Sequence, residues 1–86
     1  MEIFIYRLRL SDGTVYIGQT SDVMRRIDQH RVKEPDLKYD VLAVTDDNDA
    51  NNLEHYFIGK AYREYKSKVR NILGWGWMSG DTEFEE

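Results

Sequence analysis

Residues 4–30, FIYRLRLSDGTVYIGQTSDVMRRIDQH, contain the pattern that decides the fold of this chain. Over residues 2–10 the side chains alternate in character with the two-residue period of a β-strand. Asp12-Gly13 then favours a tight hairpin turn, and residues 14–17 form the expected return strand, which Gly18 should end. The stretch is therefore predicted to fold as strand, turn, strand and helix.

The helix that completes this stretch is predicted over residues 22–33. Thr20 and Ser21 are candidates for its N-cap, and Asp22 in the first turn suits the positive end of the helix dipole. Pro35 should stop the helix, because its ring biases the preceding residue away from helical geometry.

Two further elements are predicted downstream. Residues 37–45 carry a strand-like pattern, and a long helix is predicted over residues 50–66, with Leu53 and Phe57 on its apolar face. Gly59 inside this helix costs about 1 kcal/mol relative to alanine, so we interpret it as a site of close packing. The predicted fold is an α+β sandwich, a three-stranded antiparallel sheet flanked by helices in the order β-β-α-β-α.

The chain has 86 residues, 41% hydrophobic and 33% charged, which is typical of one small globular domain. We expect this domain over residues 1–78, with Trp75 and Trp77 capping the core, and an acidic, flexible tail over residues 79–86. No apolar run approaches the roughly 18 to 20 residues of a membrane span. The absence of cysteine excludes a disulfide framework and cysteine-based zinc sites. A cytoplasmic location fits best.

The net charge of −4 argues against nucleic-acid binding, because neutralised phosphates supply most of that affinity. The charge is unevenly distributed, however: residues 1–33 carry +2, residues 34–58 carry −6 and residues 59–70 carry +4. Positive charge thus gathers on the first helix and at the end of the second. Weak binding is expected unless a homodimer or a partner protein adds positive surface.

Four side chains of the opening stretch can reach one spot. Tyr6 and Tyr16 lie on the two hairpin strands, and Arg26 and His30 lie four residues apart on the helix, so they share a face. Two phenols, a guanidinium and an imidazole suit the handling of a phosphate group. Taken singly, each residue has an ordinary alternative, since strand tyrosines usually pack and helix arginines usually lie on the surface.

An ordered set of residues resembles the core of the GIY-YIG nuclease family. The set consists of Ile5-Tyr6, Tyr16-Ile17-Gly18, Arg26 and His30. Downstream, Leu53-Glu54 resembles the helix that carries the family's metal-binding glutamate, and Asn71 lies where a family asparagine is expected. Phe4 takes the place of the first glycine of the motif, which mainly permits a backbone shape.

The resemblance implies a metal-dependent endonuclease that hydrolyses DNA phosphodiester bonds by one-step attack of water. Glu54 would hold Mg²⁺ or Mn²⁺, since these ions prefer carboxylate oxygens. Arg26 would stabilise the charge on the scissile phosphate, and His30 would move a proton or orient a hydroxyl. The hydroxyls of Tyr6 and Tyr16 would converge on the attacking water, and either one can be the base.

The candidate nucleic-acid contacts are Arg25, Lys60, Arg63 and Asn71. The basic end of the second helix, including Lys66, Lys68 and Arg70, is expected to follow the nucleic-acid backbone without reading bases. Two alternatives remain at this point. One is a catalytically weak or inactive nucleic-acid-binding module with the same fold, and the other is a protein-interaction module that uses the acidic surface.

Overall fold

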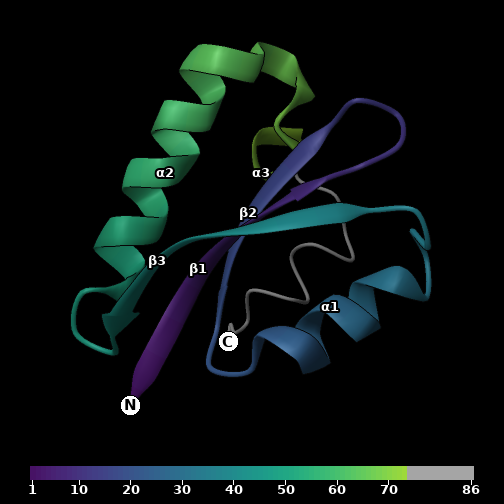
Figure 1. The fold of residues 1–86 in the computed structure, drawn as a ribbon. Coiled ribbons are helices and arrows are strands. Elements are labelled where there is room, and N and C mark those ends of the chain that lie inside the picture. Colours follow the sequence, from purple (N-terminus) through teal and green to yellow (C-terminus); the bar gives the residue numbers. More distant parts are fainter. Residues whose placement is uncertain (74–86) are drawn as a thin grey trace.

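A computed structural model describes residues 1–73 of the chain (Figure 1). The elements follow the order β1 (Glu2–Arg9), β2 (Val15–Thr20), α1 (Val23–Arg31), β3 (Lys38–Asp46), α2 (Ala50–Tyr65), the short 3-10 turn η1 (Lys66–Lys68) and α3 (Arg70–Leu73). The predicted β-β-α-β-α order is confirmed. The capping role expected of Trp75 and Trp77 and the tail expected over residues 79–86 lie outside the described residues.

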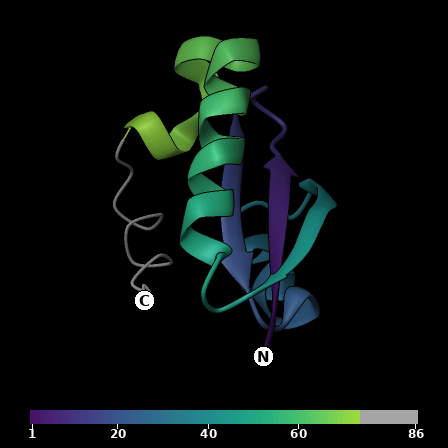
Figure 2. The ribbon, with the colours of Figure 1, turned by 90° about the vertical axis from the view of Figure 1, so that its left-hand side faces the viewer.

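The three strands form one antiparallel sheet in the order β2-β1-β3, as predicted. Strand β1 lies in the middle, where Tyr6 pairs with Gly18 and Leu8 pairs with Tyr16 of β2. Helices α1 and α2 cover opposite faces of the sheet, and Figures 1 and 2 show the sheet lying between them. Because β2 is an edge strand, residues on both of its faces are close to one border of the molecule.

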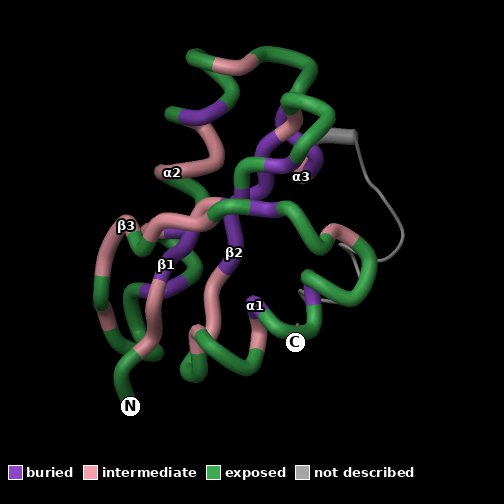
Figure 3. The backbone as a smooth tube through the Cα atoms, turned by 45° about the vertical axis from the view of Figure 1, so that its right-hand side comes forward, coloured by how far each residue is buried: buried purple, intermediate pink, exposed green. Residues whose placement is uncertain are grey.

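The alternation of β1 divides the core into two clusters. Tyr6 and Leu8 pack with Ile27 of α1 on one face of the sheet. Ile5 packs with Ala61 of α2 on the other face. In Figure 3 the buried positions concentrate on β1 and β2, so the hairpin carries the centre of both clusters.

The hairpin differs from the prediction at its second strand. Gly18 does not end β2, because pairing with β1 continues to Thr20, which lies opposite Phe4. The residue that caps α1 is Asp22, whose side chain accepts a hydrogen bond from the backbone N–H of Arg25 at 3.1 Å. The N-cap prediction at Thr20 or Ser21 is therefore wrong by one or two residues.

The turn of the hairpin is held by a buried arginine from the far end of the chain. Arg70 is only 3% exposed, and its guanidinium donates to Asp12 and Thr14, each at 2.9 Å. A cation enclosed in this way cannot follow a nucleic-acid backbone, so that prediction for Arg70 is wrong. Arg70 also begins the short helix α3, which is preceded by a parallel bridge between Val69 and Val15.

Within residues 1–73, Gly59 has no neighbour that explains it. A Cβ placed on Gly59 would meet no atom of this part of the chain within 4 Å, so the structure gives no support to the close-packing interpretation. None of the helices in the described part of the chain is long and apolar enough to cross a membrane. The cytoplasmic location stays a prediction.

Replacing Gly59 by alanine should raise the free energy of unfolding by about 0.5–1 kcal/mol, because alanine restricts the unfolded chain and fits the open helix surface. Gly13→Ala is the matched control. Gly13 has a φ of 87°, where a side chain is strained, so this substitution should destabilise the hairpin. Urea unfolding followed by circular dichroism measures both changes. A loss of stability in Gly59→Ala would mean that the outer face of α2 is engaged after all.

Candidate active site

The rings of Tyr6 and Tyr16 meet over Gly18. A Cβ added to Gly18 would lie 2.5 Å from the hydroxyl oxygen of Tyr6 and 2.9 Å from a ring carbon of Tyr16. Only a residue without a side chain leaves room for both rings. The glycine of the Tyr-Ile-Gly motif is therefore required by packing. Backbone conformation does not require it, because among the described residues positive φ angles occur at Gly13 and Lys66.

His30 reaches the same place from α1. Its ring centroid lies 6.0 Å from that of Tyr6 and 5.7 Å from that of Tyr16. The Tyr6 hydroxyl and His30 Nε2 are 3.2 Å apart, so the phenol donates when Nε2 carries no proton. Burial, and then the nearby charge of Arg26, lower the pKa of His30 to about 4. The imidazole is thus neutral at physiological pH.

Arg25 and Arg26 are neighbours on α1 but differ in burial. Arg26 is half-buried and close enough to act electrostatically on His30, one helical turn away, whereas Arg25 is exposed. The structure thus brings Tyr6, Tyr16, Arg26 and His30 together as the sequence analysis expected. Both tyrosines are about 1% exposed, so their hydroxyls lie inside the molecule rather than on its surface.

Glu54 is a residue of α2 and lies on the opposite face of the sheet. The residue is 8% exposed, and its Oε1 accepts a hydrogen bond of 2.6 Å from Nε2 of Gln19. Burial raises the pKa of Glu54, and the bond from Gln19 opposes this shift. Gly18 and Gln19 are consecutive residues of β2, so the tyrosine cluster and the glutamate are joined across one edge strand.

Gln19 is the residue that sequence reasoning missed. The strand was expected to stop at Gly18, which would have left Gln19 in a loop. The two-residue period of β2 provides the signal, because it puts Gln19 on the same face as Ile17, which packs in the α2 cluster. A longer strand would therefore have placed Gln19 beside the glutamate helix.

The donor atoms around Glu54 fit a divalent ion. Within residues 1–73 the second carboxylate oxygen, Oε2, has no hydrogen-bond donor, although the residue is buried. Nowhere in that part of the chain do three or more histidine, aspartate or glutamate side chains gather to hold an ion. Mg²⁺ often binds through one or two carboxylates, with water and substrate phosphate as the other ligands. A site with Glu54 as its one carboxylate suits that chemistry.

Asn71 holds the outer edge of β2. Its side-chain nitrogen donates to the carbonyl of Ile17 at 2.8 Å, and its side-chain oxygen accepts from the Ile17 N–H at 2.9 Å. The side chain thus makes the pair of hydrogen bonds with the Ile17 backbone that a neighbouring strand would make, between Tyr16 and Gly18. A direct contact of Asn71 with nucleic acid stays a prediction, and the observed bonds give it a role in positioning the strand.

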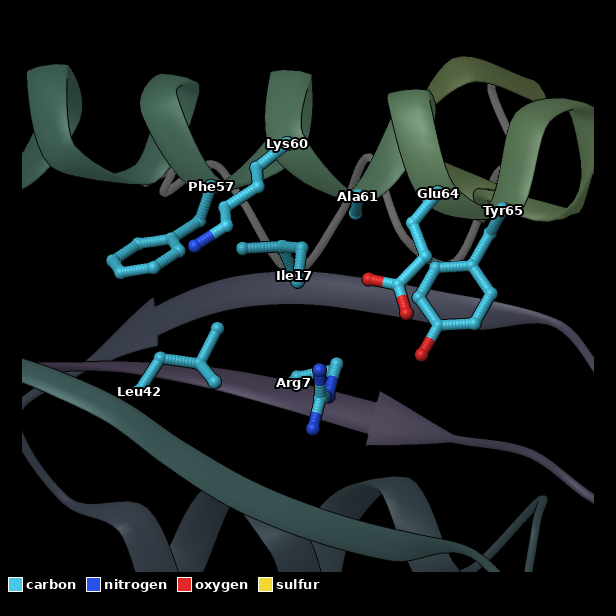
Figure 4. Close-up of a pocket in the computed structure, with 8 residues that line it drawn as sticks. All are labelled: Arg7, Ile17, Leu42, Phe57, Lys60, Ala61, Glu64 and Tyr65. Atoms are coloured by element: carbon cyan, nitrogen blue, oxygen red, sulfur yellow. The ribbon is translucent and has the colours of Figure 1, made fainter.

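The other predicted nucleic-acid contacts lie on α1 and α2. Arg25 and Arg63 are exposed. Lys60 lines a hollow of about 90 Å³ between α2 and the sheet. Figure 4 shows Lys60 and Glu64 extending from α2 into this hollow, Lys60 beside Phe57 and Glu64 beside Tyr65, with Arg7 of β1 opposite them. Because Glu64 accompanies the two cations, the hollow has no strong preference for an anion.

The hairpin, the helix packed over its tyrosines and the third strand define a small α+β domain with a buried Tyr–Tyr–His cluster. Residues 2–43 match the family model of the GIY-YIG catalytic domain. These residues therefore form a domain of the GIY-YIG nuclease family. The match includes Tyr6, Tyr16, Arg26 and His30 and ends before Glu54. Comparisons with curated proteins and with solved structures gave no significant match.

Replacing Gly18 by alanine should displace both tyrosine rings and lower the free energy of unfolding by about 1–3 kcal/mol, the usual cost of overpacking. Urea unfolding gives the energy, and the near-ultraviolet circular dichroism of the tyrosines reports the displacement. Gly59→Ala is the control with open space around the new methyl group. Equal stability of the two variants would contradict the close approach at Gly18.

The pKa of His30, which is lowered to about 4 from an ordinary value of 6.5, makes stability depend on pH. The unfolded chain binds this proton more readily, so the stabilisation is complete above about pH 6.5 and is lost as the pH falls toward 4. Its size is at most about 3 kcal/mol. His30→Gln should therefore lose less stability between pH 7 and pH 4 than the wild type in urea titrations. Parallel pH curves for the two proteins would contradict a buried, neutral His30.

Proposed function

We propose that this chain is a metal-dependent endonuclease that hydrolyses DNA phosphodiester bonds by direct attack of water. The observation that carries the proposal is the convergence of Tyr6, Tyr16 and His30 over Gly18, with ring centroids 5.7 to 6.3 Å apart. Membership of the GIY-YIG family supports nuclease chemistry in general. The proposal goes further in naming DNA as the substrate, in requiring a metal ion and in assigning a role to each residue.

Tyr6 is the better candidate to receive the proton of the attacking water. A free phenol has a pKa near 10 and is a weak base at neutral pH. The neutral His30 can accept the phenolic proton through Nε2 as the phenol oxygen takes a proton from water, which makes the phenol oxygen more basic when it is needed. Tyr16, beside the same glycine, would then position the water.

Arg26 supplies the positive charge on this side of β2. A guanidinium stays protonated throughout the physiological range and presents several donors in one plane, which suits the equatorial oxygens of a phosphoryl transition state. The negative charge that develops on phosphate also offsets the repulsion between Arg26 and a protonated His30. Proton transfer to His30 is thus coupled to charge formation at phosphorus.

Glu54 is the proposed ligand of a divalent ion, which would supply Lewis-acid stabilisation of the leaving oxygen. The site on Glu54 and the tyrosine cluster lie on the two faces of β2. Within residues 1–73 the outer edge of this strand is paired at Val15 and Ile17, but not from Gly18 to Thr20. A phosphate placed at that open part of the edge is within reach of groups from both faces.

Low sequence specificity is part of the proposal. One site cuts one strand, so a monomer should nick duplex DNA, and a homodimer or a partner protein would supply specificity. The exposed cations Arg25 and Arg63 can follow the backbone. Arg70 adds nothing to this surface, because its charge is used by Asp12.

A second candidate function is a nucleic-acid-binding module that keeps the fold and cleaves weakly or not at all. The burial of Tyr6 and Tyr16, each about 1% exposed, favours it, because buried strand tyrosines also serve as packing residues. The two candidates differ in one observable. Cleavage that depends on a divalent ion belongs to the first, whereas salt-sensitive binding without cleavage belongs to the second.

The test is a cleavage assay on supercoiled plasmid, single strands, branched duplexes and RNA with Mg²⁺ or Mn²⁺. Glu54→Gln keeps the size of the side chain and an acceptor for Gln19, so it should fold and lose cleavage by about 100-fold or more. Glu64→Gln, on the same helix but away from Gln19, should cleave like the wild type. No cleavage by the wild type, or equal cleavage by Glu54→Gln, would overturn the proposal.

A further inference from the structure

Gln19 connects the edge strand to the glutamate helix at the point where a metal ligand is proposed. Its Nε2 donates to Oε1 of Glu54 at 2.6 Å and to Oδ1 of Asn51 at 2.8 Å. Asn51 and Glu54 are three residues apart on α2, so they share a face. One amide group therefore ties two side chains of the helix to β2.

The chemistry of the three groups fixes the direction of the Gln19 amide. An ionised carboxylate only accepts hydrogen bonds, so the amide nitrogen rather than the oxygen must face Glu54. The second hydrogen of that nitrogen is taken by Asn51, which leaves the amide with a single orientation. A reversed amide would bring two oxygens together at 2.6 Å.

The backbone of Gln19 is also held in place. It belongs to β2 and lies opposite Ile5 in the pairing with β1, the central strand, and Ile5 is fully buried. A donor on such a strand is more precisely placed than one on a loop, because the sheet fixes its Cα and its direction. Glu54, on a separate element, is thus oriented by the sheet.

We propose that Gln19 is a positioning residue that binds Oε1 of Glu54 and so presents Oε2 as the oxygen for a divalent ion, with Asn51 holding the Gln19 amide. The inference rests on the proposed role of Glu54 as an ion ligand. It adds that Oε2, the oxygen that Gln19 does not bind, would be the one offered to the ion. It also connects the residue after the Tyr-Ile-Gly motif to ion binding.

The size of the effect follows from the general behaviour of groups that orient metal ligands. Removing such a partner typically weakens metal binding by about 10- to 100-fold. Gln19→Met keeps the length of the side chain and removes both donors. We expect Gln19→Met to bind Mn²⁺ about 10- to 100-fold more weakly than the wild type. Asn51→Ala should show a smaller loss, because it frees the amide without removing it.

The experiment is a titration of the full chain with Mn²⁺ in the absence of DNA, with free Mn²⁺ measured by electron paramagnetic resonance. Gln29→Met, an exposed glutamine on α1, is the matched control and should bind Mn²⁺ like the wild type. Urea midpoints of all variants separate loss of ion binding from loss of fold. In cleavage assays, Gln19→Met should need more Mn²⁺ for half-maximal rate and approach the wild-type rate at saturation.

The outcomes separate this inference from the proposed function. If the wild type binds no Mn²⁺, or Glu54→Gln binds it equally well, the metal assignment of Glu54 fails and the inference with it. If binding depends on Glu54 but Gln19→Met matches Gln29→Met, only the role of Gln19 is overturned. Should Gln19→Met unfold, Gln19→Asn replaces it, since an amide one methylene shorter falls short of Glu54, and unchanged Mn²⁺ affinity there rejects the inference.

Discussion

Tyr6 and Gly18 face each other across the β1–β2 pair with too little space between them for a single methyl group. The approach is possible because β2 presents bare backbone at this position, and it lets the phenol of the central strand lean over the edge strand. Tyr16 then fills the space on one side, and His30 closes the cluster from α1. The position of α1 follows, since Ile27 packs against the same tyrosines.

The edge strand carries the rest of the candidate site, because its two faces bring together different groups. Gly18 lies against the phenols on one face, and the side chain of Gln19 binds Glu54 on the other. The sheet thus lies between the neutral imidazole of His30 and the buried carboxylate of Glu54, and neither group neutralises the other. Consecutive residues of β2, Gly18 and Gln19, provide this separation.

Much of the fold could be predicted because the determining signals are local. The alternation of β1, the Asp12-Gly13 turn and the apolar stripe of α2 each depend on neighbours in sequence, and all three elements are present. Apart from the N-cap of α1, two of the errors arose where a distant residue decides. Gly18 was expected to end β2, but the need to admit Tyr6 explains the glycine, and the strand continues. Arg70 was assigned to the surface, although it is buried and pairs with Asp12, which is far away in the sequence.

The candidate site was predictable to the same extent. The spacing of Arg26 and His30 follows from helix geometry, and the structure places them together. Glu54 was found through its resemblance to a family helix. The two-residue period of β2 gives the face on which Gln19 lies, but it does not identify Glu54 as its partner. A hydrogen bond between residues 35 positions apart has no signature in one sequence. Gly59 shows the converse, a local signal for packing that no contact within the described residues fulfils.

The bond between Asn71 and Ile17 spans 54 positions of the chain, and this has a consequence for synthesis on the ribosome. The hairpin, α1, β3 and α2 all emerge before the residues that close the outer border of β2. Until then the nascent chain carries an unpaired strand edge with aromatic residues beside it, the kind of surface that pairs with other chains. The last described segment therefore shortens the exposed edge by pairing with Val15 and Ile17, and the risk of aggregation falls when it emerges.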